Sequence, residues 1–322
     1  MGKDSFYGVP KVLIQLAEAM NTEVVDWRLA IPPAYGEGYC KGYVFNEHIR
    51  MLVLDYKLNE ELVLTNPDKD TLGRMILFKF RNMLPVDGNA MSKTTSELPS
   101  VLIATSRIDS DQLIPVHSNR ASINIEVDAS YLQSLFRFSE PSPILQSLID
   151  NTQPLLFDQL LHASIQKVVD EMFVSSIREP FTLFYLRIKT EELICRLLVE
   201  LEKRDEEHIY DLNSKDIDSL YQAKESLLAD LSDAPSIDSL ALTAGMSASK
   251  LKRLFKQVFG KSIFSYYQDF RMQEAARLLR NEKIAVSEVG YRLGFTNLSH
   301  FTRVFKEHIG LNPKRYTKSK LE

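Results

Sequence analysis

The sequence predicts an α+β protein in which a β-rich barrel or sandwich and a set of helices precede an all-α domain. Three observations support this prediction. Short apolar runs, separated by Asn, Asp, Gly and Pro, lie within about residues 40–128, a pattern typical of strands. From about residue 129 to 205 the apolar residues recur at helical spacing. Near the end of the chain, two stretches fifty residues apart repeat nearly the same amphipathic helix.

Length and composition favour a protein of two domains. The chain has 322 residues, of which 44% are hydrophobic and 25% charged, as is usual for a globular protein. We expect one domain over residues 1–215 and a second over 216–322. No run of 18 apolar residues occurs, and the first twenty residues lack a signal-peptide layout, so we expect no membrane span and a cytoplasmic location.

The net charge of −4 hides an asymmetry along the chain. From Asp233 onward the chain carries a net charge of +8, and the preceding part carries −12. A basic C-terminal module behind an acidic N-terminal part fits a protein that binds a polyanion only through its tail.

The N-terminal part begins with a short helical pattern, Val9–Met20. The following Pro32–Pro33 and the glycines 36, 38 and 42 are turn signals. The predicted strands are Ile49–Tyr56, Met75–Phe80, Val101–Thr105 and Ala121–Val127.

Helical periodicity follows from Ala129. The predicted helices are Ala129–Phe138, Pro143–Asn151, Gln153–Ser176, Pro180–Arg204 and Asp216–Leu231. The helix Pro180–Arg204 is strongly apolar on one face, which fits either a core helix or pairing with a second copy in a homodimer. Both interpretations remain open at this point.

The basic module contains two helix-turn-helix patterns, over residues 236–259 and 286–309. In the first, Ser236 caps a helix that runs through Ala244 and is ended by Gly245, and Ser247 caps the helix Ala248–Phe259. In the second, Val286–Leu293 precedes a turn at Gly294, and Asn297 caps the helix Leu298–Ile309.

Residues 262–280, which separate these patterns, contain neither Pro nor Gly and predict one long helix. Nineteen helical residues span roughly 28 Å. With the turns added, the two outer helices are expected roughly 34 Å apart, one turn of B-DNA. One chain can then reach two successive major grooves of double-stranded DNA.

The two repeated helices each have an apolar face and a cationic face. Phe255 and Phe305 belong to the apolar faces and are expected in the core. Arg253 and Arg303 are the best candidates for bidentate contact with guanine, and Lys256 and Lys306 suit phosphates. The full set of predicted base-reading residues is Ser249, Lys252, Arg253, Ser299, His300 and Arg303.

These residues resemble the C-terminal DNA-binding domain of the AraC/XylS family of bacterial transcription regulators. The resemblance covers Ser232–Thr317, and its most specific part is GF-(x)5-F-x-R-x-FK-x-x-x-G-x-x-P-x-x-Y at Gly294–Tyr316. The chain departs from the family pattern at Gly290, where an alanine is common, and at Ala285, a poor helix cap. Both departures are expected to weaken the second unit slightly.

The resemblance implies a transcription regulator that is effector-responsive and activates promoters with RNA polymerase as a partner. It also implies that the N-terminal half is a cupin-like sensor followed by dimerisation helices, with an unknown small-molecule effector. The N-terminal half has no residue-level motif, so no ligand-binding residue is assigned. The alternative is a constitutive or architectural DNA-binding protein whose N-terminal domain does not sense a ligand.

The sequence offers no enzyme site. Cys40 and Cys195 lie far apart, too few for the zinc-holding cysteine cluster of a DNA-repair alkyl acceptor. His48, His117, His162 and His208 form no metal-ligand spacing, and no phosphate-binding glycine loop occurs. We therefore expect no catalytic residues, no metal and no cofactor.

Overall fold

The computed structural model of the chain describes residues 8–60, 74–83, 98–105, 118–136, 141–161, 163–174, 177–204, 209–281 and 284–318. The chain divides into two compact units, Met1–Leu212 and Asn213–Glu322. The sequence predicts the boundary between the two domains at residues 215 and 216, close to this division. Each unit contains a hydrophobic core of its own.

The N-terminal unit is built on one antiparallel sheet of seven strands in the order β1-β2-β3-β6-β4-β5-β7. The strands are β1 (Arg28–Ala30), β2 (Gly36–Val44), β3 (Ile49–Leu58), β4 (Met75–Arg81), β5 (Ser100–Thr105), β6 (Ser118–Asp128) and β7 (Leu156–Leu160). The expected mixture of strands and later helices is confirmed. The cupin-like barrel or sandwich is not confirmed, because the described strands form a single sheet with β1 and β7 at its two ends.

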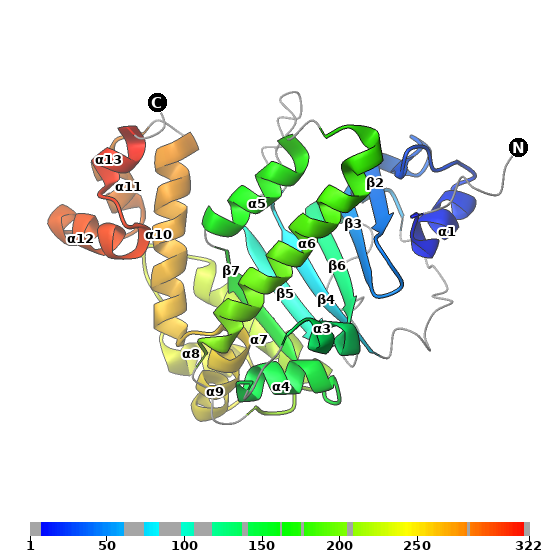
Figure 1. The fold of residues 1–322 in the computed structure, drawn as a ribbon. Coiled ribbons are helices and arrows are strands. Elements are labelled where there is room, and N and C mark those ends of the chain that lie inside the picture. The colour runs from blue at the N-terminus through cyan, green and yellow to red at the C-terminus, as the bar shows by residue number, and fades with distance from the viewer. Residues whose placement is uncertain are drawn as a thin grey trace, which may run out of the picture. The chain divides into compact units, whose positions relative to one another are not determined.

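Helices cover the sheet on both faces. They are α1 (Lys11–Ala19), α3 (Ala129–Leu135), α4 (Pro143–Asp150), α5 (Ala163–Val174) and α6 (Glu179–Glu202). On β3, Met51 and Val53 share a core with side chains of α3 to α6, whereas Leu54 shares a core with side chains of α1. Since successive side chains of a strand point to opposite faces, α1 packs on the face opposite α3–α6. Figure 1 shows α5 and α6 lying across the sheet.

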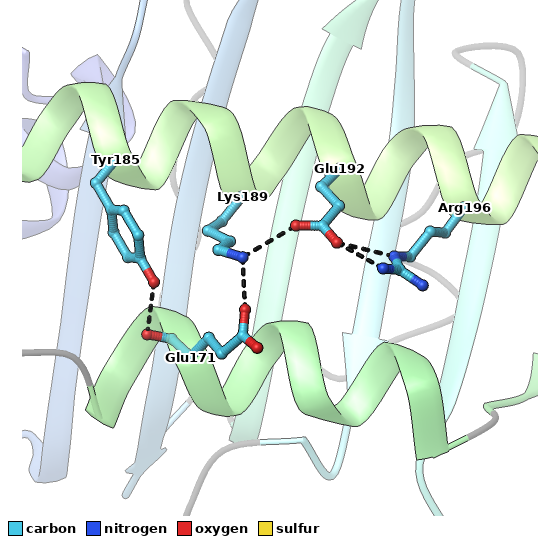
Figure 2. A network of polar contacts seen from close by, with 5 residues as sticks. All are labelled: Glu171, Tyr185, Lys189, Glu192 and Arg196. Atoms are coloured by element: carbon cyan, nitrogen blue, oxygen red, sulfur yellow. Dashed lines mark hydrogen bonds and ion pairs between the residues drawn. The ribbon is translucent and has the colours of Figure 1, made fainter.

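A polar network joins α5 to α6 (Figure 2). Lys189 Nζ lies 2.5 Å from Glu171 Oε2 and 3.0 Å from Glu192 Oε2, while Arg196 donates two hydrogen bonds to Glu192. The Tyr185 hydroxyl donates to the backbone oxygen of Glu171. The hydrogen bonds to Glu171 and Glu192 raise the pKa of Lys189, and the hydrogen bonds from Arg196 and Lys189 lower the pKa of Glu192. The network therefore fixes how α5 lies on α6.

The predicted helix Gln153–Ser176 was wrong in its first part. Leu156–Leu160 forms β7, which pairs with β5, and α5 begins only at Ala163. On β7, Leu156, Phe157 and Asp158 are all buried, and Asp158 Oδ1 lies 2.6 Å from Arg81 Nη2. A short apolar run buried on both faces carries no period that distinguishes a strand from a helix, which explains the error.

The interpretation of the glycines 36, 38 and 42 as turns was also wrong, because all three lie inside β2. Gly38 has φ +103, and a Cβ there would lie 2.7 Å from Tyr56 Cα on β3. At Gly42 a Cβ would meet the Pro10 ring at 2.7 Å. These glycines permit close backbone approach rather than a chain reversal.

The C-terminal unit consists of helices alone in its described residues. They are α7 (Ser214–Leu228), α8 (Ile237–Thr243), α9 (Ala248–Phe259), α10 (Ile263–Asn281), α11 (Val286–Arg292), α12 (Leu298–Ile309) and α13 (Pro313–Lys318). The predicted boundaries of α8 to α12 are confirmed to within one residue. Figure 1 shows α8 and α9 at one end of α10, with α11, α12 and α13 along its side.

Two short helix pairs, α8–α9 and α11–α12, thus flank the long helix α10. Met272, Ala275 and Leu279 of α10 share a core with Phe301 and Phe305 of α12. At the other pair, Phe255 of α9 packs edge-on against Tyr266 of α10, with ring centroids 5.6 Å apart. Aromatic packing against one helix therefore holds both pairs.

Candidate nucleic-acid interface

Side-chain caps set the start of α9 and α12. Ser247 Oγ accepts a hydrogen bond from the backbone N–H of Lys250 at 3.3 Å. Asn297 Oδ1 accepts from the backbone N–H groups of Ser299 and His300 at 2.9 and 3.1 Å. Both helices end at a glycine with a left-handed backbone, φ +72 at Gly260 and φ +84 at Gly310. The two helices therefore have the same length and the same type of start and end.

Helix α9 buries its apolar face and exposes its cationic face. Its buried apolar residues are Leu251, Leu254, Phe255, Val258 and Phe259. Ser249, Lys252, Arg253 and Lys256 are exposed. The placement of Phe255 in the core is confirmed, and the four predicted contact residues lie together on the surface of one helix.

Helix α12 shows the same division. Phe301, Val304 and Phe305 are buried. The exposed face carries the predicted residues Ser299, His300, Arg303 and Lys306. The ring of His300 also packs edge-on against Phe295, with centroids 5.7 Å apart. This side chain therefore packs on the turn before α12.

The turns that precede the two helices are similar but not equal. Gly245 (φ +60) and Gly294 (φ +76) both adopt the left-handed conformation. A Cβ at Gly245 would meet nothing within 4 Å, whereas one at Gly294 would lie 2.7 Å from Ser232 Cα. The second turn is therefore pressed against the backbone of the segment before α8.

The two departures from the family pattern have different structural consequences. Ala285 precedes α11 and makes no side-chain cap, whereas Ser236 caps α8 by accepting from the Ser239 N–H at 3.1 Å. At Gly290 a Cβ would lie 2.9 Å from Leu298 and 3.3 Å from Phe301. The glycine thus allows α11 to pack closely on α12, which the sequence did not reveal.

Arg271 of α10 is a supporting residue that the sequence did not indicate. Its guanidinium lies 4.2 Å from the centre of the Phe295 ring and 5.3 Å from that of Tyr267. Nη2 donates to the backbone oxygen of Leu293, and burial lowers the pKa of this arginine. Arg271 therefore anchors the turn between α11 and α12, and no local pattern distinguishes it from the other arginines of α10.

Asp269 of α10 contacts both halves of the unit. Its Oδ2 pairs with Lys261 Nζ, which follows α9, and its Oδ1 lies 2.5 Å from His308 Nδ1 on α12. His308 interrupts the apolar pattern of α12, and this contact accounts for the interruption.

Ion pairs involve both exposed helices. On α9, Lys250 Nζ lies 2.6 Å from Asp216 Oδ1 of α7. On α12, Arg303 Nη1 lies 3.1 Å from Glu307 Oε1. Helix α9 contains four basic residues and no acidic residue of its own.

Within the described residues, no three His, Cys, Asp or Glu side chains are placed to hold a metal ion. No helix among these residues is long and apolar enough to cross a membrane.

A family described as a helix-turn-helix domain matches residues 240–319. The regulatory protein PchR of Pseudomonas aeruginosa is 36% identical over 75 residues, 23% of this chain and 25% of PchR. The arabinose operon regulatory protein of Escherichia coli is 35% identical over 80 residues, 25% of this chain and 27% of that protein. The first curated relatives are therefore matched over only about a quarter of their length.

A longer match reaches into the N-terminal unit. The HTH-type transcriptional regulator MtrA of Neisseria gonorrhoeae is 27% identical over 198 residues, 60% of this chain and 64% of MtrA. Among solved structures, an AraC-type transcriptional regulator from Chromobacterium violaceum is 27% identical with a TM-score of 0.31, covering 33% of this chain and 95% of that chain.

Proposed function

We propose that the whole protein is a sequence-specific transcription regulator that responds to an effector, because a helix-turn-helix domain family matches residues 240–319. The observation that carries this proposal is the pair of matched helices, α9 and α12, each with a buried apolar face and an exposed cationic face. A surface of this kind suits the major groove, where side chains read base edges and neutralise phosphates.

We assign α8–α9 and α11–α12 as two helix-turn-helix units that enter successive major grooves. The first helix of each unit would cross the backbone, and α9 and α12 would lie in the grooves. Arg253 and Arg303 would each read a guanine, with Ser249, Lys252, Ser299 and His300 contacting neighbouring base edges. Lys256 and Lys306 lie further along each helix and would contact phosphates.

The N-terminal unit would supply sensing and dimerisation. One face of α6 is buried in the core, and its other face exposes Phe181, Phe184, Ile188 and Val199. We propose that this exposed apolar stripe pairs with a second copy of the chain, since large apolar side chains gathered on one helix face are typical of an interface. A cupin-like sensor, a small-molecule effector and contact with RNA polymerase stay predictions from the family resemblance.

The proposal is tested by selecting duplexes from a random pool with the full chain and then footprinting the selected site. We expect an enriched sequence with two G·C-containing half-sites about 10 base pairs apart. A set of metabolites added to the footprint would then reveal the effector. Selection that returns no sequence preference would contradict the proposal and favour an architectural DNA-binding protein.

A further inference from the structure

The exposed faces of α9 and α12 differ in one acidic residue. Helix α9 carries Lys250, Lys252, Arg253 and Lys256 without an acid, whereas α12 carries two basic residues, two histidines and Glu307. Position 307 of the second helix corresponds to Gln257 of the first, and Gln257 is only 1% exposed. Glu307 is instead an exposed group beside the predicted guanine-reading arginine.

Glu307 holds one end of the Arg303 guanidinium. Nη1 donates to Glu307 Oε1 at 3.1 Å, and the two side chains are 64% and 56% exposed. An exposed pair of this kind stabilises a fold by at most about 1 kcal/mol, so its effect on folding is small. The contact uses Nη1, which leaves the Nε–Nη2 edge of the planar group for a second, bidentate acceptor.

We propose that Glu307 is a positioning residue that makes α12 selective for guanine. This inference rests on the proposed DNA-binding function. Holding Nη1 reduces the rotamer freedom that Arg303 loses when its remaining edge donates to guanine O6 and N7. The same carboxylate repels phosphates, so it weakens contacts that carry no sequence information.

The two helices then contribute differently to binding. Helix α9 supplies more of the sequence-independent attraction to phosphates, because it keeps three basic residues besides Lys250, which pairs with Asp216, and has no acid of its own. Helix α12 supplies less attraction to phosphates and more discrimination between base pairs, because Glu307 orients Arg303 and places a negative charge next to it. On α9, Gln257 takes the position that matches Glu307, and its side chain is neutral and buried.

The test compares full chains carrying Glu307→Ala, Arg303→Ala or both changes on the selected site, its single-base-pair variants and a scrambled duplex. Arg303→Ala identifies the base pair that Arg303 reads. At that pair, Glu307→Ala is expected to reduce discrimination about threefold to tenfold while affinity for the scrambled duplex rises. In the Arg303→Ala background, adding Glu307→Ala should leave discrimination at that pair unchanged.

Glu288→Ala is the matched control. Glu288 makes an exposed ion pair four residues from its partner, Arg292, with 2.7 Å between Arg292 Nη2 and Glu288 Oε1, but it lies on α11. It should leave discrimination unchanged. The role of Glu307 would be overturned if Glu307→Ala left discrimination between base pairs unaltered. It would also be overturned if Glu307→Ala reduced discrimination equally in the Arg303→Ala background. Either result would leave the proposed function intact. A wild-type chain that binds no duplex would instead overturn both.

Discussion

At the scale of single residues, Arg253 is the side chain whose removal should most clearly report base reading. It is exposed on α9 beside Lys252 and Lys256, so its truncation should leave the fold intact. We expect Arg253→Ala to lose about 1–3 kcal/mol of binding free energy on the selected site and to relax preference at one base pair. Fluorescence anisotropy against single-base-pair variants of that site measures both quantities.

The control for this prediction is Arg292→Ala on α11, which removes an exposed arginine outside the two predicted reading helices. It should lower affinity less and leave base preference unchanged. If Arg253→Ala binds every variant as the wild type does, the assigned outward face of α9 is wrong.

In the C-terminal unit, the sequence predicts those residues whose role follows from the repeated helical pattern. The exposure of Arg253 and Arg303 and the burial of Phe255 follow from helical period alone. Arg271 and Gly290 could not be found in this way, because their importance depends on which helix packs against them. Helical periodicity predicts on which face of a helix a residue lies, and only the packed structure shows which side chains contact it.

At the scale of elements, the turn before α12 depends on Gly294. A left-handed alanine costs about 1–2 kcal/mol, and the Cβ would also press on the backbone of Ser232, which adds about 1–3 kcal/mol. We therefore expect Gly294→Ala to destabilise the C-terminal unit by clearly more than Gly245→Ala. Gly245 has the same backbone conformation but open space around it.

Urea unfolding followed by circular dichroism measures this difference. Trp27, the only tryptophan of the chain, lies in the N-terminal unit, and its fluorescence reports that unit separately. Equal destabilisation by the two substitutions would show that the close approach of Gly294 to Ser232 is absent.

Strand β2 should make the N-terminal unit sensitive to alkaline pH. Burial raises the pKa of Cys40 from 9.0 to about 12 and that of Tyr43 from 10.0 to about 12. Since both folded-state pKa values are raised, the stability they contribute is complete below pH 9 and is lost progressively as pH rises toward 12. Trp27 fluorescence should show a urea midpoint that is constant up to about pH 9 and falls above it.

Cys40→Ala should flatten the first part of the fall, just above pH 9, because the thiol of Cys40 has a lower unfolded-state pKa than the hydroxyl of Tyr43. Cys195, which is exposed on α6, provides the control, and Cys195→Ala should retain the wild-type profile. A Cys40→Ala profile as steep as that of the wild type would contradict the burial of this thiol.

Elements were predictable where one periodicity dominated and local signals agreed. The helices α9 and α12 combine a clear apolar face, a capping residue and a terminal glycine, and their boundaries were predicted correctly. The sequence did not predict the strands β2 and β7, because the contacts that explain their residues are made with neighbouring strands. Gly38 is required by the backbone of β3, and Asp158 is buried through its pairing with Arg81 of β4.

At the scale of the whole molecule, dimerisation is expected to depend on α6. Phe184 is 67% exposed on the apolar stripe that also contains Phe181 and Ile188. Phe184→Glu should shift the chain from dimer to monomer without loss of folding, because the substituted side chain lies at the surface and a buried charge would oppose pairing. Sedimentation velocity over a range of concentrations measures this shift.

Val25→Glu is the matched control, since Val25 is 61% exposed in the same unit but lies outside the stripe. It should leave the oligomeric state unchanged. The proposal that α6 forms the dimer contact would be contradicted if the wild-type chain remained monomeric at every concentration, or if the Phe184→Glu variant still dimerised.

The division of charge along the chain also belongs to this scale. The positive charge lies in the part that contains α9 and α12, and the preceding part is acidic. DNA affinity should therefore fall steeply with salt, although the whole chain carries a net charge of −4.

The most direct test of this account is a hydroxyl-radical and methylation-interference footprint of the full chain on its selected duplex. It should show two contacted major-groove segments on one side of the duplex, about 10 base pairs apart, each with a guanine whose methylation blocks binding. A single contacted segment, or two segments on opposite sides of the duplex, would contradict the assignment of α9 and α12 as paired reading helices.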